Sequence, residues 1–308
     1  MIHDPAPSLP VWKVPPPDVS FRNLGDPIVH LKKDFRRVWA QVRRFLRRWY
    51  WGILASGVAV ALPAFFLLHP HDAGLVDWVR SAEAKGLDQA AGRLGVWGDF
   101  THFNLILCAS IWTIAFFRRS RLFQRLAIVV LMASIMSGAT CNLLKQLTGR
   151  PRPHQEFPDR FHGVTAAIRG WDFHSFPSGH TSTAFASASA LLAGAGPVGM
   201  IGGGASLLFS GSVSWARVYK DRHYPTDVVA GIWLGAVFGL AAGLPYRRIR
   251  RRVRRRFAYR VESMTLPLLD PASFVQADPP PGTGQGGAEA SDLGTTRSSS
   301  TQLERETL

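Results

Sequence analysis

Residues 181–216 read TSTAFASASALLAGAGPVGMIGGGASLLFSGSVSWA, and none of these side chains is charged. The run is too long for one ordinary membrane crossing, because a helix needs about 20 apolar residues to cross the hydrocarbon core. Gly194 and Pro197 interrupt it, and both residue types break helices. The run therefore predicts two membrane-spanning helices joined by a short turn.

Four further uncharged runs are long enough to cross a bilayer. Polar residues near the start of one of them, Thr101, His102 and Asn104, make that run the weakest of the set. The apolar residues are continuous rather than alternating, which indicates helices and not barrel strands. With the divided run they make six spans and predict an all-α, polytopic membrane protein. The four runs are Trp49–Leu68, Phe100–Phe117, Leu126–Leu144 and Val228–Tyr246.

Positive charge is concentrated between the apolar runs. The chain has 308 residues and a formal net charge of +15, with arginine the commoner basic residue. Three basic segments fall on one face of a six-span alternation, and the positive-inside bias makes that face cytoplasmic, with both termini. We expect them to contact anionic lipid headgroups, whereas nucleic-acid binding by residues 247–256 is not expected. The segments are LKKDFRRVWAQVRRFLRRW (31–49), RRSRLFQR (118–125) and YRRIRRRVRRR (246–256).

Composition divides the chain into four parts. Residues 1–48 form a Pro-rich and then basic cytoplasmic segment, and residues 49–246 form the six-span domain. Residues 247–267 are a basic juxtamembrane segment, and 268–308, rich in Pro, Gly, Ser and Thr, are predicted to be a disordered cytoplasmic tail. In the loop 69–99, apolar residues recur every three or four positions. This spacing predicts an amphipathic helix on the outer surface, with a plain connecting helix as the alternative.

Neither the N-terminus nor the cysteines indicate processing or cross-linking. No cleavable signal peptide is visible, so we expect the first span to act as its own insertion signal. Cys108 and Cys141 both lie inside predicted spans, where we interpret them as small apolar packing residues. No zinc-type spacing occurs and no disulfide framework is indicated.

Three polar clusters lie at span ends on the face opposite the basic segments. They are KQLTGRPRP (145–153), FPSGH (176–180) and ARVYKDRHYPTD (216–227). Because polar side chains at span ends reach interfacial water, we expect the clusters to meet in one pocket at the outer surface. The residues expected there are Lys145, Arg152, Ser178, Gly179, His180, Arg217, His223 and Asp227.

Such a pocket is suited to an oxyanion. Lys145 and Arg152 supply positive charge, and Arg217 adds a planar fork that matches a phosphate. Ser178 and the Gly179 backbone can donate hydrogen bonds from a helix start, where peptide N–H groups face anions. Since the cations of the protein cover the phosphoryl oxygens, we expect no metal and no other cofactor.

Two histidines and a carboxylate predict a reaction in this pocket. Asp227 follows His223 by four residues, which on a helical turn places both on one face, so Asp227 can orient the His223 ring. A ring held in this way presents its other nitrogen as a nucleophile. His180 can give a proton to the leaving oxygen and later take one from water. Other polar residues of the same loop are interpreted as solvated: His154, His162, Asp172 and His174.

The three clusters resemble the signature of the type 2 phosphatidic acid phosphatase superfamily, which also contains the vanadium haloperoxidases and certain acid phosphatases. That signature is Lys, six residues, Arg-Pro; then Pro-Ser-Gly-His; then Ser-Arg, five residues, His, three residues, Asp. The matching positions are Lys145 with Arg152-Pro153, residues 177–180, and Arg217 with His223 and Asp227.

One position departs from the signature. Ala216 stands where the family has Ser, which removes one expected hydroxyl, and Ser214 is out of register. The charged members of the third cluster are all present. The resemblance covers about Trp49–Tyr246 and says nothing of either terminal segment.

The resemblance implies a membrane lipid phosphatase that hydrolyses a lipid phosphomonoester or pyrophosphate at the outer leaflet through a phosphohistidine. Implied substrates are phosphatidic acid, phosphatidylglycerophosphate, polyprenyl pyrophosphate and phosphorylated lipid A, and motifs that contact only phosphate do not choose among them. A lipid phosphotransferase with the same intermediate is the alternative. A transporter is disfavoured, because charges occur only at span ends and no internal repeat is visible. We expect the protein in the bacterial cytoplasmic membrane.

Overall fold

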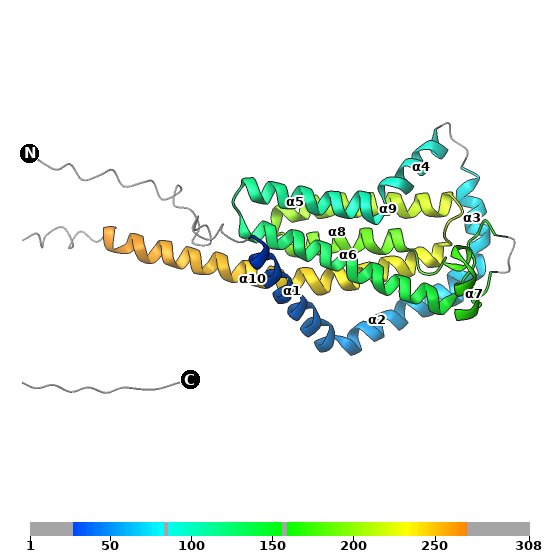
Figure 1. Cartoon of the computed structure of the whole chain (residues 1–308), viewed down its shortest axis with the longest axis horizontal. Coiled ribbons are helices and arrows are strands. Elements are labelled where there is room, and N and C mark those ends of the chain that lie inside the picture. Colours follow the sequence, from blue (N-terminus) through cyan, green and yellow to red (C-terminus); the bar gives the residue numbers. More distant parts are fainter. Residues whose placement is uncertain (1–26, 83–85, 156–158, 270–308) are drawn as a thin grey trace, which may run out of the picture. The chain divides into compact units, whose positions relative to one another are not determined.

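The computed structural model describes residues 27–82, 86–155 and 159–269, and within these ranges the chain is helical without a strand (Figure 1). The predicted all-α class is therefore confirmed. Short 3-10 or π-helical turns join several helices, among them the π-helical segment Phe100–Leu105. The α-helices are α1 (Pro27–Arg48), α2 (Tyr50–Pro63), α3 (Asp72–Arg80), α4 (Leu87–Trp97), α5 (Ile106–Phe117), α6 (Arg121–Thr148), α7 (Val164–Arg169), α8 (Gly179–Gly194), α9 (Pro197–Tyr219) and α10 (Pro225–Leu269).

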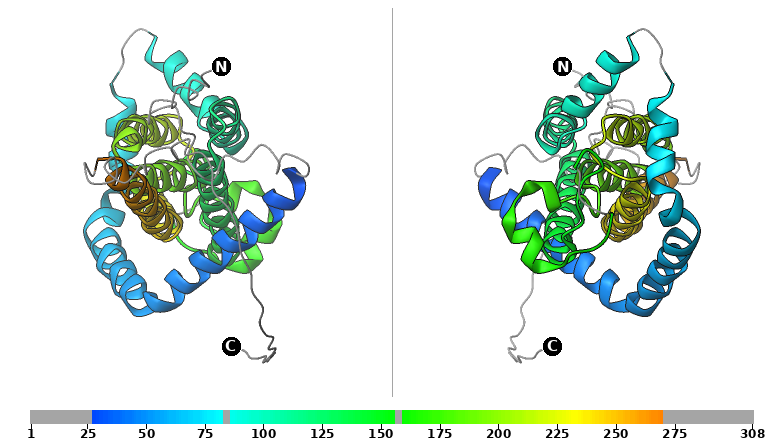
Figure 2. Two further views of the ribbon diagram at one scale, coloured as in Figure 1. Left: turned by 90° about the vertical axis from the view of Figure 1, so that its left-hand side faces the viewer. Right: turned by 90° about the vertical axis from the view of Figure 1, so that its right-hand side faces the viewer.

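Helices α5, α6, α8, α9 and α10 run side by side, and α8 lies inside this bundle (Figure 1). The helix α1 is amphipathic and packs Val38 and Val42 against the cluster that contains Leu126 and Val129 of α6. By contrast α2 has no buried residue and lies at the periphery (Figure 2). Its bundle contacts include the indole N–H of Trp233, which donates to Ser56 Oγ at 3.2 Å.

Three described helical stretches are long and apolar enough to cross a membrane: Tyr50–Arg80, Arg121–Thr148 and Pro225–Val253. A fourth is possible if the bent pair Leu87–Trp97 and His102–Phe117 counts as one span. These helices make the chain a membrane protein. The uncharged run 181–216 does divide at the predicted break, into α8 and α9.

Helices α8 and α9 do not qualify as spans on length and composition. The first has 16 residues, and twelve of them are buried, including Thr181, Ser182 and Ser187. Because neighbouring helices cover α8, its sequence need not be apolar enough to face lipid. The six-span count is therefore still a prediction.

The structure agrees with the predicted helix in the outer loop but not with every predicted segment boundary. The loop 69–99 contains two short helices, α3 and α4, so the predicted helical character is present. At the other end α10 continues without a break through Tyr246 to Leu269, and the predicted boundary at residue 247 is not a helix end. The predictions for residues 1–26 and 270–308 lie outside the described residues.

A glycine seam allows α10 to lie against the backbone of α8. A Cβ added at Gly235 would lie 2.5 Å from the carbonyl oxygen of Ser182, and one added at Gly231 would lie 2.8 Å from that of Ser178. Residues four apart share one face of a helix, and small residues on such a face let two membrane helices approach closely. The seam consists of Gly231, Gly235, Gly239 and Gly243.

Replacement of a seam glycine should therefore separate α8 from α10. We expect Gly235→Ala to lower the thermal unfolding temperature of the purified protein, at a cost of about 1–3 kcal/mol, the range for an overfilled interior. The matched control is Gly211→Ala on α9, where an added Cβ has no neighbour within 4 Å. Equal unfolding temperatures for the two variants would show that the seam does not set the packing.

Candidate active site

Six of the eight predicted site residues line one cavity of about 460 Å³. They come from the end of α6, the loop after it, the start of α8, the end of α9 and the turn before α10. The two remaining residues, Ser178 and Asp227, are fully buried behind the wall. All three clusters thus meet in one place. The lining residues are Lys145, Arg152, Gly179, His180, Arg217 and His223.

The cations of this cavity have hydrogen-bond donors to spare. The buried Nε atoms of Arg152 and Arg217 have no hydrogen-bond partner. Burial and the neighbouring Arg222 lower the pKa of Arg152, so the cluster is repulsive when empty. A Cβ added at Gly179 would lie 3.6 Å from Lys145 Nζ, which places this ammonium group over the start of α8. Buried donors without partners are rare in proteins, and an oxyanion would satisfy them.

Ser178 lies behind the cavity rather than in its wall. Its backbone N–H donates to the Asp227 carbonyl oxygen at 3.0 Å, and its hydroxyl accepts from Thr181 at 3.1 Å. Ser214 Oγ lies 3.0 Å from Thr181 Oγ1 and extends this chain of hydroxyls, while Ala216 is buried without contributing to it. No side chain caps α8. The peptide N–H groups of its first turn, from Gly179 on, therefore remain for a ligand.

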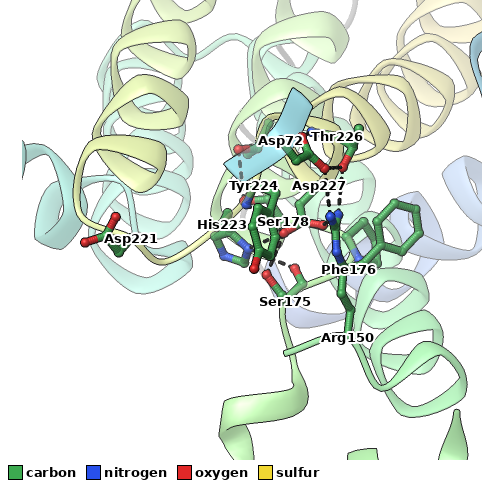
Figure 3. A network of polar contacts seen from close by, with 12 residues as sticks. Asp72, Arg150, Ser175, Phe176, Ser178, Asp221, His223, Tyr224, Thr226 and Asp227 are labelled. Carbon is green, nitrogen blue, oxygen red and sulfur yellow. Dashed lines mark hydrogen bonds and ion pairs between the residues drawn. The ribbon is translucent and has the colours of Figure 1, made fainter. Parts of the chain in front are cut away.

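The geometry of His223 defines which ring nitrogen is reactive. Its Nδ1 lies 2.8 Å from the carbonyl oxygen of Ser175 (Figure 3). Because a carbonyl oxygen only accepts, Nδ1 carries the hydrogen and Nε2 keeps its lone pair. Burial lowers the pKa of His223 to about 3. The ring is therefore neutral at physiological pH and lines the cavity as a potential nucleophile.

Asp227 acts on His223 less directly than its spacing suggested. Its Oδ2 lies 3.6 Å from His223 Nδ1, beyond hydrogen-bond distance. The same Oδ2 accepts from Ser175 Oγ at 2.5 Å and from the Tyr224 backbone N–H at 2.9 Å. Its Oδ1 accepts from Arg150 Nη1 at 2.6 Å (Figure 3). Asp227 thus holds Ser175, and the carbonyl of Ser175 holds the ring.

His180 has a carboxylate neighbour that sequence reasoning missed. Asp99 Oδ1 lies 3.6 Å from His180 Nε2, and both residues line the cavity. Burial and the neighbouring Arg217 lower the pKa of His180 to about 4, and the Asp99 carboxylate opposes this shift by favouring the protonated imidazole. Asp99 belongs to the turn between α4 and Phe100–Leu105, far from the three clusters in sequence. Nothing in its local sequence indicates this contact.

The other polar residues of the 150–178 loop do not line the cavity. His154 Nδ1 lies 2.9 Å from the Asp221 carbonyl oxygen, and the Asp172 carboxylate accepts from Gln155. His174 is buried, so its interpretation as a solvated residue is wrong. Throughout residues 27–82, 86–155 and 159–269, no group of three or more His, Cys, Asp or Glu side chains is arranged to hold a metal ion.

The fold and site agree with a known class of proteins. Residues 125–250, which contain all three clusters, match the sequence model of the PAP2 superfamily. The resemblance predicted from the clusters is therefore confirmed.

Particular relatives can also be named. The Lipid A 1-phosphatases of Rhizobium johnstonii and Rhizobium etli are 39% and 38% identical to the chain over 121 residues. That stretch is 37% of this chain and 45% and 47% of the two relatives, so the chain matches less than half of either.

Two solved structures are also similar to the chain. Aquifex aeolicus LpxE has 20% identity and a TM-score of 0.39, over 56% of this chain and 93% of that one. A transmembrane PAP2-type phosphatidylglycerolphosphate phosphatase from Bacillus subtilis has 15% identity and a TM-score of 0.46, over 65% and 95%.

Proposed function

We propose that the protein is a membrane phosphatase that removes a phosphoryl group from a lipid. The observation that carries the proposal is the cavity itself, which Arg152 and Arg217, each with a buried Nε that has no hydrogen-bond partner, line together with His180 and His223. The PAP2 match and the names of the Rhizobium relatives support this class of activity.

The proposed reaction proceeds in two steps through a phosphohistidine. His223 Nε2 attacks phosphorus, and the electron pair of the breaking P–O bond goes to the leaving oxygen, which takes a proton from His180. Lys145, Arg152 and Arg217 stabilise the charge on the phosphoryl oxygens. In the second step His180 takes a proton from water, whose oxygen attacks phosphorus, and the P–N bond electrons return to Nε2.

A lipid substrate is supported by the extent of the cavity. Beyond the cationic end it follows α6 past Ala139 and Gly138 to Ile135 and Ser134. From Lys145 to Ser134 an α-helix rises about 16 Å, which leads from a polar headgroup into the depth of the membrane. Small side chains on α6 leave room there for the apolar part of a lipid.

We infer that the cavity opens on the outer face of the bacterial cytoplasmic membrane. The basic runs between α5 and α6 and along α10 lie at the opposite ends of these helices from the cavity residues, and a third basic run precedes α2. Both termini are then cytoplasmic.

A reporter active only in the cytoplasm should be active when fused after Leu308. Activity of a reporter that requires export, at this same position, would place the catalytic residues on the inner face instead.

Hydrolysis is tested with purified protein in detergent. It should release phosphate from at least one of phosphatidic acid, phosphatidylglycerophosphate, polyprenyl pyrophosphate and lipid A.

Because protein cations take the place of a metal, activity should survive EDTA, and vanadate should inhibit by occupying the phosphoryl position. The proposal fails if folded protein releases phosphate from none of these. It also fails in its metal-free form if EDTA abolishes activity and Mg²⁺ restores it. Transfer of the phosphoryl group to an added acceptor would identify a phosphotransferase.

Substitution of the two histidines should affect the reaction in different ways. His223→Ala should abolish turnover and any acid-labile phosphoenzyme, since it removes the nucleophile. His180→Ala should slow poor leaving groups by about 100- to 10,000-fold, the usual contribution of a general acid, and partly spare an aryl phosphate. The measurement is rapid-quench trapping with labelled substrate. His154→Ala, in the loop after α6 and outside the cavity, is the control and should behave as wild type. Wild-type labelling of the His223→Ala variant would assign the nucleophile elsewhere.

A further inference from the structure

The geometry points to Arg150, buried beside the cavity, as a positioning residue that fixes His223 through Asp227 and Ser175. This inference rests on the proposed function, because it concerns the residue assigned as nucleophile. Arg150 belongs to none of the matched signature positions, although it precedes Arg152 in the repeated sequence Arg-Pro-Arg-Pro. Its side chain is fully buried.

All five N–H groups of the Arg150 guanidinium are used within the protein. Nε and Nη2 donate to the two carboxylate oxygens of Asp159, each at 2.8 Å, and Nη2 also donates to Asp72 Oδ2 at 2.7 Å. Nη1 donates to Asp227 Oδ1 at 2.6 Å and to Thr226 Oγ1 at 2.7 Å. A guanidinium has five such hydrogens, so Arg150 has none for a substrate phosphate. It differs in this respect from Arg152, which has an unpartnered Nε.

Arg150 instead holds Ser175 from two sides (Figure 3). Its carbonyl oxygen accepts from the Ser175 backbone N–H at 3.0 Å, and its side chain binds the Asp227 that accepts from Ser175 Oγ. The Ser175 carbonyl then accepts from His223 Nδ1. This closed ring of contacts fixes the one group that sets the tautomer and direction of the His223 ring.

Asp72 extends the arrangement to a part of the chain outside residues 125–250. It is fully buried at the start of α3. Its Oδ2 accepts from Arg150 and from the Thr226 hydroxyl, and its Oδ1 accepts from the Thr226 backbone N–H at 3.1 Å, in the first turn of α10. The segment before the superfamily match is therefore tied to the same network as Asp227.

The test compares Arg150→Lys, Arg150→Gln and Asp72→Asn with wild type. Lysine keeps the charge but not the planar fork that binds several partners at once. For both Arg150 variants we expect kcat to fall about 100-fold, the size of effect that a misplacement of about 1 Å produces, with KM changed less than about threefold. Asp72→Asn is a milder change, and it keeps the inference testable if the Arg150 variants fail to fold. We expect it to lower kcat about tenfold.

The matched control is Arg125→Gln, which removes another arginine bound to an aspartate, Asp34, at 3.0 Å. It should keep wild-type kcat. A raised KM with unchanged kcat in the Arg150 variants would make Arg150 a phosphate ligand and overturn the inference. A lowered unfolding temperature with unchanged kcat would show a merely structural role and also overturn it.

A second readout separates this inference from the proposed function. In protein with ¹⁵N-labelled histidine, the Nδ1–H signal of His223 should be present in wild type and shifted or lost in Arg150→Lys and Asp72→Asn. An unchanged signal in both variants would overturn the inference. If wild type released no phosphate but its His223 signal responded to these variants, the proposed function would fail and the positioning role would stand.

Discussion

The close approach of α8 and α10 is the constraint on which the site depends. With glycine at every fourth position of α10, the two backbones meet without side chains between them. At the end of the seam, the Ser178 N–H reaches the Asp227 carbonyl oxygen at 3.0 Å. This contact joins the helix start that carries His180 to the turn that carries His223. A wider gap between the helices would separate His180 from His223, so that the two histidines would no longer line the same cavity.

The three arginines Arg150, Arg152 and Arg217 have two different roles near the cavity. The number of guanidinium hydrogen bonds that each forms within the protein distinguishes these roles. Arg150 forms five hydrogen bonds within the protein and stabilises two fully buried carboxylates, Asp72 and Asp227. Arg152 and Arg217 line the cavity, and each keeps a buried Nε donor without a partner. Burying an unpaired charge is costly. The electrostatic free energy of the cavity is therefore least favourable when no ligand is bound. A negatively charged phosphate would compensate the positive charge of these arginines.

Sequence spacing predicted the meeting of the three clusters, because a regular alternation of spans places every second loop on the same face. It also predicted the break near Gly194 and Pro197, since both residues disfavour a continuous helix. The contacts of Asp72, Asp99 and Arg150 were not predictable, because they join loops whose approach depends on tertiary packing. Ser178 shows a related limit. Its motif identified the helix start, but not that its own N–H and hydroxyl are used inside the protein.

The polar composition of α8 has a consequence for how the protein is made. Thr181, Ser182, Ser187 and Ser189 give this helix little gain in free energy from entering lipid by itself. Its hydroxyl partners Ser134 and Ser137 lie on α6, which leaves the ribosome earlier, whereas the glycine seam of α10 is synthesised last. We therefore expect α8 to leave the translocon against α6 and to stay uncovered on one side until α10 has been synthesised. Biogenesis is thus linked to the same helix pair that assembles the site.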